Sequence, residues 1–213
     1  MRIIERTVRK QGESLHLLLN GVRLPFKASL VESTKASNSL NNRANGIQGQ
    51  SFNRTTDASE TPIRSGMYFE RECDPNNVYL IISSIPEPKY PRLMFLYALR
   101  CNERVTLFRD EKKLDPNDET VTVDSRNEYA KNILVNKNIT SKKLYDNEQG
   151  AIDQTSFYIY CPSCYGAQVM DKVQFRNGIY RVESVNDILT DIEISEGVDV
   201  LLLSYKDEDN QNV

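Results

Sequence analysis

A hairpin pattern near the C-terminus constrains the fold of this chain most strongly. In residues 171–184, Asp-Lys-Val-Gln-Phe-Arg-Asn-Gly-Ile-Tyr-Arg-Val-Glu-Ser, apolar and polar residues alternate on both sides of Asn177-Gly178. Asn-Gly favours the two-residue turn of a β-hairpin, because both turn positions need positive φ. With this turn, one face of the hairpin is apolar and the other is polar. The predicted pairs are Phe175 with Tyr180, Val173 with Val182, Gln174 with Arg181 and Lys172 with Glu183.

A looser form of the same pattern occurs around residues 66–85. The segment Tyr79-Leu-Ile-Ile-Ser83 matches Tyr180-Arg-Val-Glu-Ser184 at the tyrosine, at the β-branched third position and at the serine. Each segment follows a short predicted strand and a turn. Two explanations stay open at this point: an internal duplication, or two hairpins that obey the same local rules.

Strand and turn signals occupy most of the remaining chain. Asn20-Gly21 separates two apolar runs and predicts a second hairpin. In contrast, residues 32–61 are rich in Ser, Asn, Thr, Gly and Gln, and they predict a polar loop or arm of about 30 residues, far longer than a usual connection. The further predicted strands lie at residues 15–19, 22–26, 66–70, 78–85, 93–101, 120–123, 156–160 and 198–205.

These patterns predict a mostly β fold, with one or two small antiparallel β-barrel or sandwich units and long loops or arms. Residues 110–118 are charged and rich in turn formers, so they mark the best internal boundary. We therefore expect an N-terminal β domain over residues 1–118, which includes the arm at 32–61, and a C-terminal β-barrel domain over residues 119–213. Whether these parts are separate barrels or halves of one sheet system stays open.

The charge balance argues against a protein that binds nucleic acid through bulk positive charge. The chain has 27 Lys and Arg against 30 Asp and Glu, whereas binding to phosphates needs an excess of cations on some face. No stretch approaches the apolar length of a membrane span, and Arg2, Glu5 and Arg6 lie where a signal peptide would be apolar. We therefore expect a protein that is kept in a cytoplasm-like compartment, with its four cysteines reduced.

Cys161-Pro-Ser-Cys164 is the one spacing in the sequence that could carry metal or redox chemistry. A structural zinc site needs four ligands, and Cys73, Cys101 and the sole histidine, His16, form no second pair of ligands. A thioredoxin-type motif would open a helix after a strand, whereas a Tyr-Gly pair follows here. We interpret the two cysteines as small residues at a strand end and keep Cys161 and Cys164 as the metal candidates.

Catalytic side chains occur in no recognisable arrangement in the sequence. His16 lies within Leu15-His-Leu-Leu-Leu19, which is typical of a half-buried strand histidine rather than of a general base. The sequence has no nucleophile elbow and no glycine-rich phosphate loop. We therefore expect no enzymatic activity and no cofactor.

The C-terminal stretch resembles the head-closure and head–tail connector proteins of tailed bacteriophages, small β-barrels in which such a hairpin precedes a last strand. A second segment, from Gly66 onward, is similar to a phage structural domain whose sheet ends in a Cys-Asn pair, here Cys101-Asn102. Connector proteins are often about half this length, which implies that residues 1–110 are an added or duplicated barrel. The matching residues of the hairpin are Asp171, Val173, Phe175, Asn177, Gly178, Tyr180 and Val182, and the last strand would be Val198–Tyr205.

The resemblance implies a structural protein of the virion without catalytic activity. Identical copies would form a ring in the phage neck, which joins the portal and head to the tail and helps to retain or gate DNA. The implied partners are portal or adaptor proteins, tail proteins, and DNA that passes through the lumen without sequence-specific binding; no membrane is involved. Such a protein is assembled in the host cytoplasm and resides in the neck or tail.

Three alternatives stay open beside this expectation. The chain could be a tail or baseplate structural or adaptor protein of the same virion, which would share the absence of catalysis. It could instead be a monomeric β-type binding module. The third alternative is a metal or redox protein built on Cys161 and Cys164.

Overall fold

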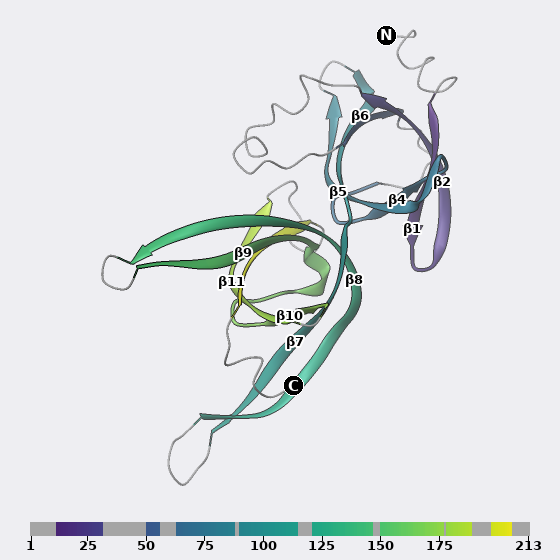
Figure 1. Cartoon of the computed structure of the whole chain (residues 1–213). Helices are drawn as coiled ribbons and strands as arrows, with labels where there is room; N and C mark the ends of the chain where they lie inside the picture. Colours follow the sequence, from purple (N-terminus) through teal and green to yellow (C-terminus); the bar gives the residue numbers. More distant parts are fainter. Residues whose placement is uncertain are drawn as a thin grey trace. The chain divides into compact units, whose positions relative to one another are not determined.

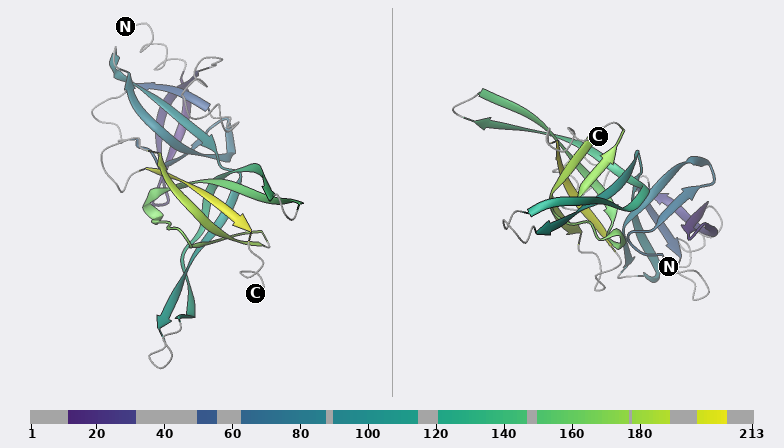
Figure 2. Two further views of the ribbon diagram at one scale, coloured as in Figure 1. Left: turned by 90° about the vertical axis from the view of Figure 1, so that its left-hand side faces the viewer. Right: turned by 90° about the horizontal axis from the view of Figure 1, so that it is seen from below.

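The computed structural model describes residues 12–31, 50–55, 63–87, 90–114, 121–146, 150–176, 178–188 and 197–205. These residues form twelve β-strands and one short 3-10 helix, so the prediction of a mostly β fold is confirmed (Figures 1 and 2). Contacts between residues divide the chain into two units. The first unit comprises Met1–Cys101, Pro162–Cys164 and Ile188–Val198, and the second comprises Asn102–Cys161, Tyr165–Asp187 and Asp199–Val213.

Six antiparallel strands of the first unit close into a barrel in the order β1-β2-β3-β6-β5-β4. The predicted hairpin at Asn20-Gly21 is confirmed, because φ is 48° at Asn20 and 80° at Gly21 and Leu19 pairs with Val22. The six strands are β1 (Glu13–Leu19), β2 (Val22–Val31), β3 (Gln50–Thr55), β4 (Tyr68–Arg71), β5 (Asp74–Glu87) and β6 (Tyr90–Arg100).

Strand β3 corrects the prediction that residues 32–61 are a continuous loop or arm. Its backbone pairs with β2 on one side and with β6 on the other, so that Phe52 lies opposite both Leu30 and Leu96. Two neighbouring strands satisfy the backbone of a segment that is poor in apolar residues, and periodicity in the sequence does not reveal this. Residues 32–49 and 56–61 of the predicted arm lie outside the described residues.

The core of the first barrel comes from alternate residues of its strands. Leu15 and Leu17 of β1 are buried, whereas His16 between them is half-buried, as predicted for a strand histidine. Phe69 of β4 stacks on its ladder partner Tyr79 of β5, with ring centroids 5.3 Å apart. This aromatic pair joins two neighbouring strands inside the core.

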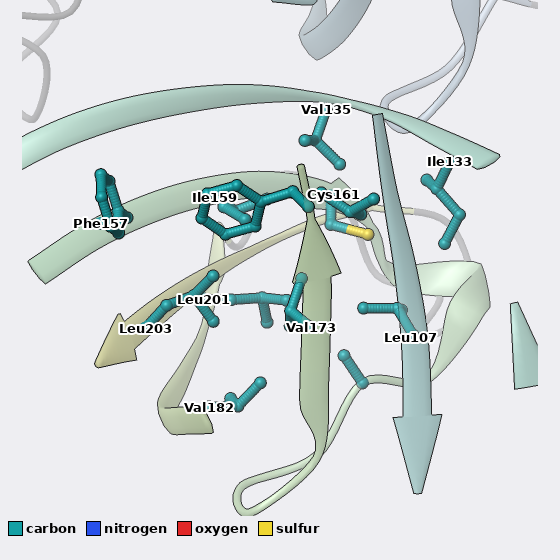
Figure 3. Close-up of a cluster of buried hydrophobic side chains, with 13 residues drawn as sticks. Leu107, Ile133, Val135, Phe157, Ile159, Cys161, Val173, Val182, Leu201 and Leu203 are labelled. Carbon is teal, nitrogen blue, oxygen red and sulfur yellow. The ribbon is translucent and has the colours of Figure 1, made fainter. Parts of the chain in front are cut away.

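The second unit forms another closed barrel, in the order β7-β8-β9-β12-β11-β10. Its strands are β7 (Glu103–Leu114), β8 (Val121–Asp146), β9 (Gly150–Pro162), β10 (Lys172–Phe175), β11 (Gly178–Ile188) and β12 (Val198–Tyr205). The short helix η2 (Ser163–Tyr165) follows β9 in the chain. Figure 3 shows buried side chains of this unit pointing toward one another from opposite strands. They include Leu107, Ile133, Val135, Phe157, Ile159, Cys161, Val173, Val182, Leu201 and Leu203.

The division between the units differs from the predicted boundary after residue 118. The change occurs between Cys101 and Asn102, at the junction of β6 and β7. Residues 110–114 of the predicted linker belong to β7, which pairs with β8 up to the Leu114–Val121 pair. A charged, turn-rich sequence here marks the end of a hairpin, because solvated hairpin ends and linkers share the same composition.

The hairpin at residues 171–184 is present, but its predicted register is wrong. Gly178, predicted as a turn residue, belongs to β11 and pairs with Phe175, and φ at Arg176 is 55°; Asn177 lies outside the described residues. Because the shift amounts to two residues along one strand, every side chain keeps its predicted face. The observed pairs are Lys172 with Arg181, Val173 with Tyr180, Gln174 with Ile179 and Phe175 with Gly178.

The position of Gly178 explains this register. A Cβ atom on Gly178 would lie 3.0 Å from Cε2 and 3.3 Å from Cζ of Tyr180. The ring of Tyr180 therefore covers the glycine, and the residue is needed as a strand position without a side chain. Phe175 is buried, and Tyr180 is half-buried against the same core, as predicted.

The two barrels have the same strand order. If β7 to β12 are matched in sequence with β1 to β6, each barrel has its third strand beside its sixth and its fourth strand beside its first. The matched turns before β4 and β10 also share their hydrogen bonds, and the match aligns Tyr79 with Tyr180, as in the sequence comparison. This agreement favours an internal duplication. The bonds run from Gly66 N to Ile81 O (2.8 Å) and from Ile81 N to Met67 O (2.9 Å) in one barrel, and from Met170 N to Val182 O (2.9 Å) and from Val182 N to Asp171 O (2.8 Å) in the other.

Strand β8 is 26 residues long, several times the average strand. Its first part pairs with β7 up to Val135, and its second part pairs with β9 from Asn136 onward. The outer parts of both ladders leave the barrel as two-stranded ribbons, in teal and in green in Figure 1. We call them the β7–β8 arm (Glu111–Leu114 with Val121–Ser125) and the β8–β9 arm (Ser141–Asp146 with Gly150–Thr155).

Candidate functional site

The functional candidates of the second unit surround the hairpin formed by β10 and β11. Phe175 and Tyr180 stack with ring centroids 4.2 Å apart and an interplanar angle of 8°. Phe157 of β9 meets both rings edge-on, at 5.5 Å and 5.2 Å. Tyr205, which is 44% exposed, meets Tyr180 at 5.6 Å and extends the aromatic cluster to the surface.

A lysine lies against two rings of this aromatic cluster. The Nζ atom of Lys137 lies 5.1 Å from the ring centroid of Phe157 and 4.5 Å from that of Phe175. The same Nζ is 3.1 Å from Oε2 of Glu103, and Nε of Arg176 is 3.2 Å from that oxygen. The ammonium thus has a carboxylate partner and two aromatic faces, which together offset its partial removal from water.

Asp171 is the centre of a second polar cluster, at the turn before β10. Arg109 of β7 binds its carboxylate with two hydrogen bonds, of 2.8 Å from Nε and 2.7 Å from Nη2. Tyr129 of β8 donates a hydrogen bond of 2.7 Å from its hydroxyl, and the backbone N–H of Gln168 donates one of 2.8 Å. Arg109 also binds the carbonyl of Gly166 at 3.0 Å. We call Arg109, Tyr129 and Asp171 the carboxylate brace.

The brace moves the pKa values of Asp171 and Tyr129 further from neutral pH. Burial alone would raise the pKa of Asp171, but the hydrogen bonds from Arg109, Tyr129 and Gln168 outweigh burial and lower it. The pKa of Tyr129 is raised, first by burial and then by its hydrogen bond to Asp171. The carboxylate therefore stays charged and the phenol stays neutral, so the arrangement suits a rigid support of the turn better than proton transfer.

The supported turn presents two apolar side chains to solvent. Val169 is 53% exposed and Met170 is 52% exposed. Met170 also has a φ of 76°, a conformation that costs free energy for a residue with a side chain. The supported turn therefore carries a small exposed apolar pair.

A polar cluster in the first unit joins the start of β1 to the turn after β4. Arg71 binds Glu13 with two hydrogen bonds, of 2.7 Å from Nε and 2.9 Å from Nη2. The thiol of Cys73 donates to the same carboxylate at 2.6 Å, and this bond chiefly raises the pKa of Cys73. The thiol of Cys73 is therefore neutral and lies beside the Arg71–Glu13 ion pair, so it is not a reactive thiolate.

The two cysteines of the Cys-Pro-Ser-Cys motif lie in different surroundings. Cys161, at the end of β9, is buried in the core of the second unit, whereas Cys164 on η2 is exposed. The motif therefore spans a strand end, as interpreted from the sequence. Among the described residues, no group of three or more His, Cys, Asp and Glu side chains is placed to hold a metal ion.

The sequence predicted that Phe175 and Tyr180 share the apolar face of the hairpin, but it predicted neither the brace nor the lysine. Arg109 lies 62 residues before Asp171, and Tyr129 lies 42 residues before it. No local pattern joins residues so far apart, because the barrel closure that brings their strands together is a long-range event. Lys137 lies outside every strand that the sequence predicted.

No described helix is long and apolar enough to span a membrane. Compared with known proteins, the chain matches no family model, no curated protein and no solved structure.

Proposed function

We propose that this chain is a non-enzymatic structural protein of a tailed-phage virion, which forms a ring in the neck that joins the portal and head to the tail. The ring would help to retain or gate DNA that passes through its lumen. Its partners would be identical subunits, portal or adaptor proteins and tail proteins. The resemblance of the hairpin to connector proteins supplies the phage part of this proposal.

The observation that carries the proposal is the pair of arms in the second unit. An isolated two-stranded hairpin is marginally stable in water, and its outer edges are open to pairing with another chain. Each arm extends beyond the barrel as a two-stranded ribbon. Arms of this kind suit a protein whose exposed strand edges pair with strands of neighbouring chains when the assembly forms.

The polar clusters support the absence of catalysis in the proposal. The carboxylate brace supports a turn, the Glu13–Arg71 pair joins two strand ends, and Lys137 is paired within its barrel. Each charged group at these places is used in a contact that stabilises the fold. A structural role explains these contacts without a substrate.

The test is the location of the chain in purified particles. We expect peptides of this protein in virions at a fixed copy number, and density for a double barrel with two arms at the neck by cryo-electron microscopy. Particles that contain portal and tail proteins but none of this chain would refute the proposal. Density elsewhere in the tail or baseplate would instead support the alternative of a tail structural or adaptor protein.

A monomeric binding module is a second candidate, which the exposed pair Val169 and Met170 favours. In that case one partner would cover the turn, and the arms would not be needed for assembly. Substitution of Val169 and Met170 by serine would then abolish binding to the partner, whereas removal of both arms would leave it unchanged. If the chain is instead a neck protein, removal of both arms should impair assembly more than the two serine substitutions do.

A further inference from the structure

We propose that copies of this chain join edge to edge along strand β8. The outer part of the second half of β8 in one copy would pair with the outer part of the first half of β8 in the next copy. This inference rests on the structural role proposed above and names the partner as a second copy of this chain. It is argued from the backbone hydrogen bonds of β8 with β7 and β9.

The two halves of β8 have ladders on opposite sides. Residues Val121–Ile133 take their ladder partners from β7, and residues Ile139–Asp146 take theirs from β9. The strand order places β7 and β9 on the two sides of β8. In the described part of the chain, each half of β8 therefore has its ladder on one side, and the sides alternate from the first half to the second.

Asn102 ends the ladder on the β7 side. Its backbone N–H donates to the carbonyl of Val135 at 3.0 Å. Its side chain then continues the pattern: Nδ2 donates to the carbonyl of Lys137 at 2.8 Å, and Oδ1 accepts from the Lys137 N–H at 2.7 Å. The side-chain amide thus takes the place of one further strand residue, and the next position on this side of β8 is Ile139.

The direction of the backbone groups follows from these bonds. In an antiparallel strand, the N–H and C=O of alternate residues point to the same side. The backbone hydrogen-bonding groups of Val135 and Lys137 point toward the β7 side. The ladder with β9 runs without a register shift from Asn136 to Asp146. Ser141 and Lys143 therefore direct their N–H and C=O groups away from β9, along the edge beyond Asn102, where the described ladders place no partner strand.

The two half-edges are complementary to each other. Both belong to one strand, both extend into an arm, and they lie on opposite sides of β8. Joining the second half of one copy to the first half of the next leaves each end of the pair with one unused half-edge. Such a head-to-tail contact repeats, and it closes into a ring when the rotation between copies permits.

The test uses two trimmed variants of the full chain. The first lacks Ser141–Asp146 and Gly150–Thr155, and the second lacks Glu111–Leu114 and Val121–Ser125. Each deletion removes ladder pairs together and retains the pair at the base of the arm, Thr140–Ser156 or Asp110–Arg126. Both deletions leave in place the ladder pairs nearer the barrel, so circular dichroism should show the same folded barrels.

Native mass spectrometry then reads the assembly state. We expect the full-length protein to form multimers and each trimmed variant alone to have the mass of one chain. An equimolar mixture of the two variants should form complexes of two chains and none larger, because each variant supplies the half-edge that the other lacks. A two-fold contact between identical edges predicts instead that one trimmed variant still forms dimers by itself.

A point substitution tests the same edge without shortening an arm. Lys143→Pro removes an N–H that points away from β9, so it should abolish multimers while the arm remains paired. Lys143→Ala is the matched control, because it removes the same side chain but retains the N–H, and it should assemble as the original protein does. Equal assembly of the two variants would overturn the inference.

The outcomes separate this inference from the proposed function. A full-length protein that stays monomeric at every concentration, or a mixture of trimmed variants that stays monomeric, would overturn edge pairing even if the chain occurs in virions. Conversely, multimers that respond to the trimming as expected would support edge pairing even if virions lack the chain, in which case the assembly belongs to another structure.

Discussion

Gly66 and Met170 occupy the same position in the two barrels. Both have a positive φ, of 82° and 76°, and both donate their N–H to the fifth strand of their barrel, to Ile81 and Val182. Their surroundings differ, because a Cβ on Gly66 would lie 2.5 Å from the carbonyl oxygen of Gly197, whereas the side chain of Met170 is exposed. The two copies of one turn therefore have different sequence requirements.

This difference predicts opposite effects of substitution. Gly66→Ala should lower the free energy of unfolding by about 2–4 kcal/mol, because it combines backbone strain with a close contact. Met170→Gly should raise it by about 0.5–1 kcal/mol, because it relieves the positive φ and loses little buried surface. Urea denaturation measures both. Gly21→Ala is the control for strain alone, because Gly21 has a φ of 80° and open space around it.

The carboxylate brace should be the most sensitive polar group of the second unit. Asp171→Ala leaves Arg109 and Tyr129 without their shared acceptor, and we expect a loss of about 3 kcal/mol in the free energy of unfolding. Arg23→Met at the exposed Arg23–Glu70 pair is the control and should change stability by less than about 0.5 kcal/mol. Similar losses in the two variants would contradict the brace.

Stability should also depend on pH through Asp171. Its pKa is lower in the folded protein than in the unfolded chain, so the unfolded state takes up the proton first as the pH falls. The contribution is therefore complete above about pH 5, where the unfolded carboxyl is ionised, and it is lost as the pH falls through the folded pKa. Urea midpoints between these limits should fall less steeply in Asp171→Asn. An unchanged slope in that variant would show that other carboxyls cause the dependence.

Gly178→Ala should displace the ring of Tyr180 from Phe175. The new Cβ would lie 3.0 Å from the ring, and we expect a destabilisation of about 1–3 kcal/mol, which is typical of overpacking. The background Tyr180→Leu supplies the control, because without the ring the same change at Gly178 should cost much less. A double-mutant cycle measures this coupling, and additive effects would refute the contact.

The hairpin shows which part of the fold the sequence could predict. Alternation of apolar and polar residues correctly assigned the faces of β10 and β11. Within one strand, successive side chains point to opposite faces, and a register shift of two residues does not change the face. The predicted register was wrong, because the Asn-Gly rule assumed that Gly178 is needed for a positive φ in the turn. At Asn20-Gly21 the same rule succeeded, since no ring covers Gly21.

Strand β8 shows why other parts could not be predicted. The sequence predicted no strand in its second part, because burial periodicity identifies only strands that form a core. Here the ladder with β9 orders the backbone. The carboxylate brace was equally out of reach, since its members meet only after the barrel closes.

The continuity of β8 has a mechanical consequence. One covalent strand carries both the β7 ladder and the β9 ladder, and ladder hydrogen bonds lie across the strand direction. A pull along β8 therefore loads many of these bonds in shear at the same time, whereas a pull across an arm would break them one after another. Tension applied at one arm is transmitted through the barrel wall to the other arm without passing through a loop.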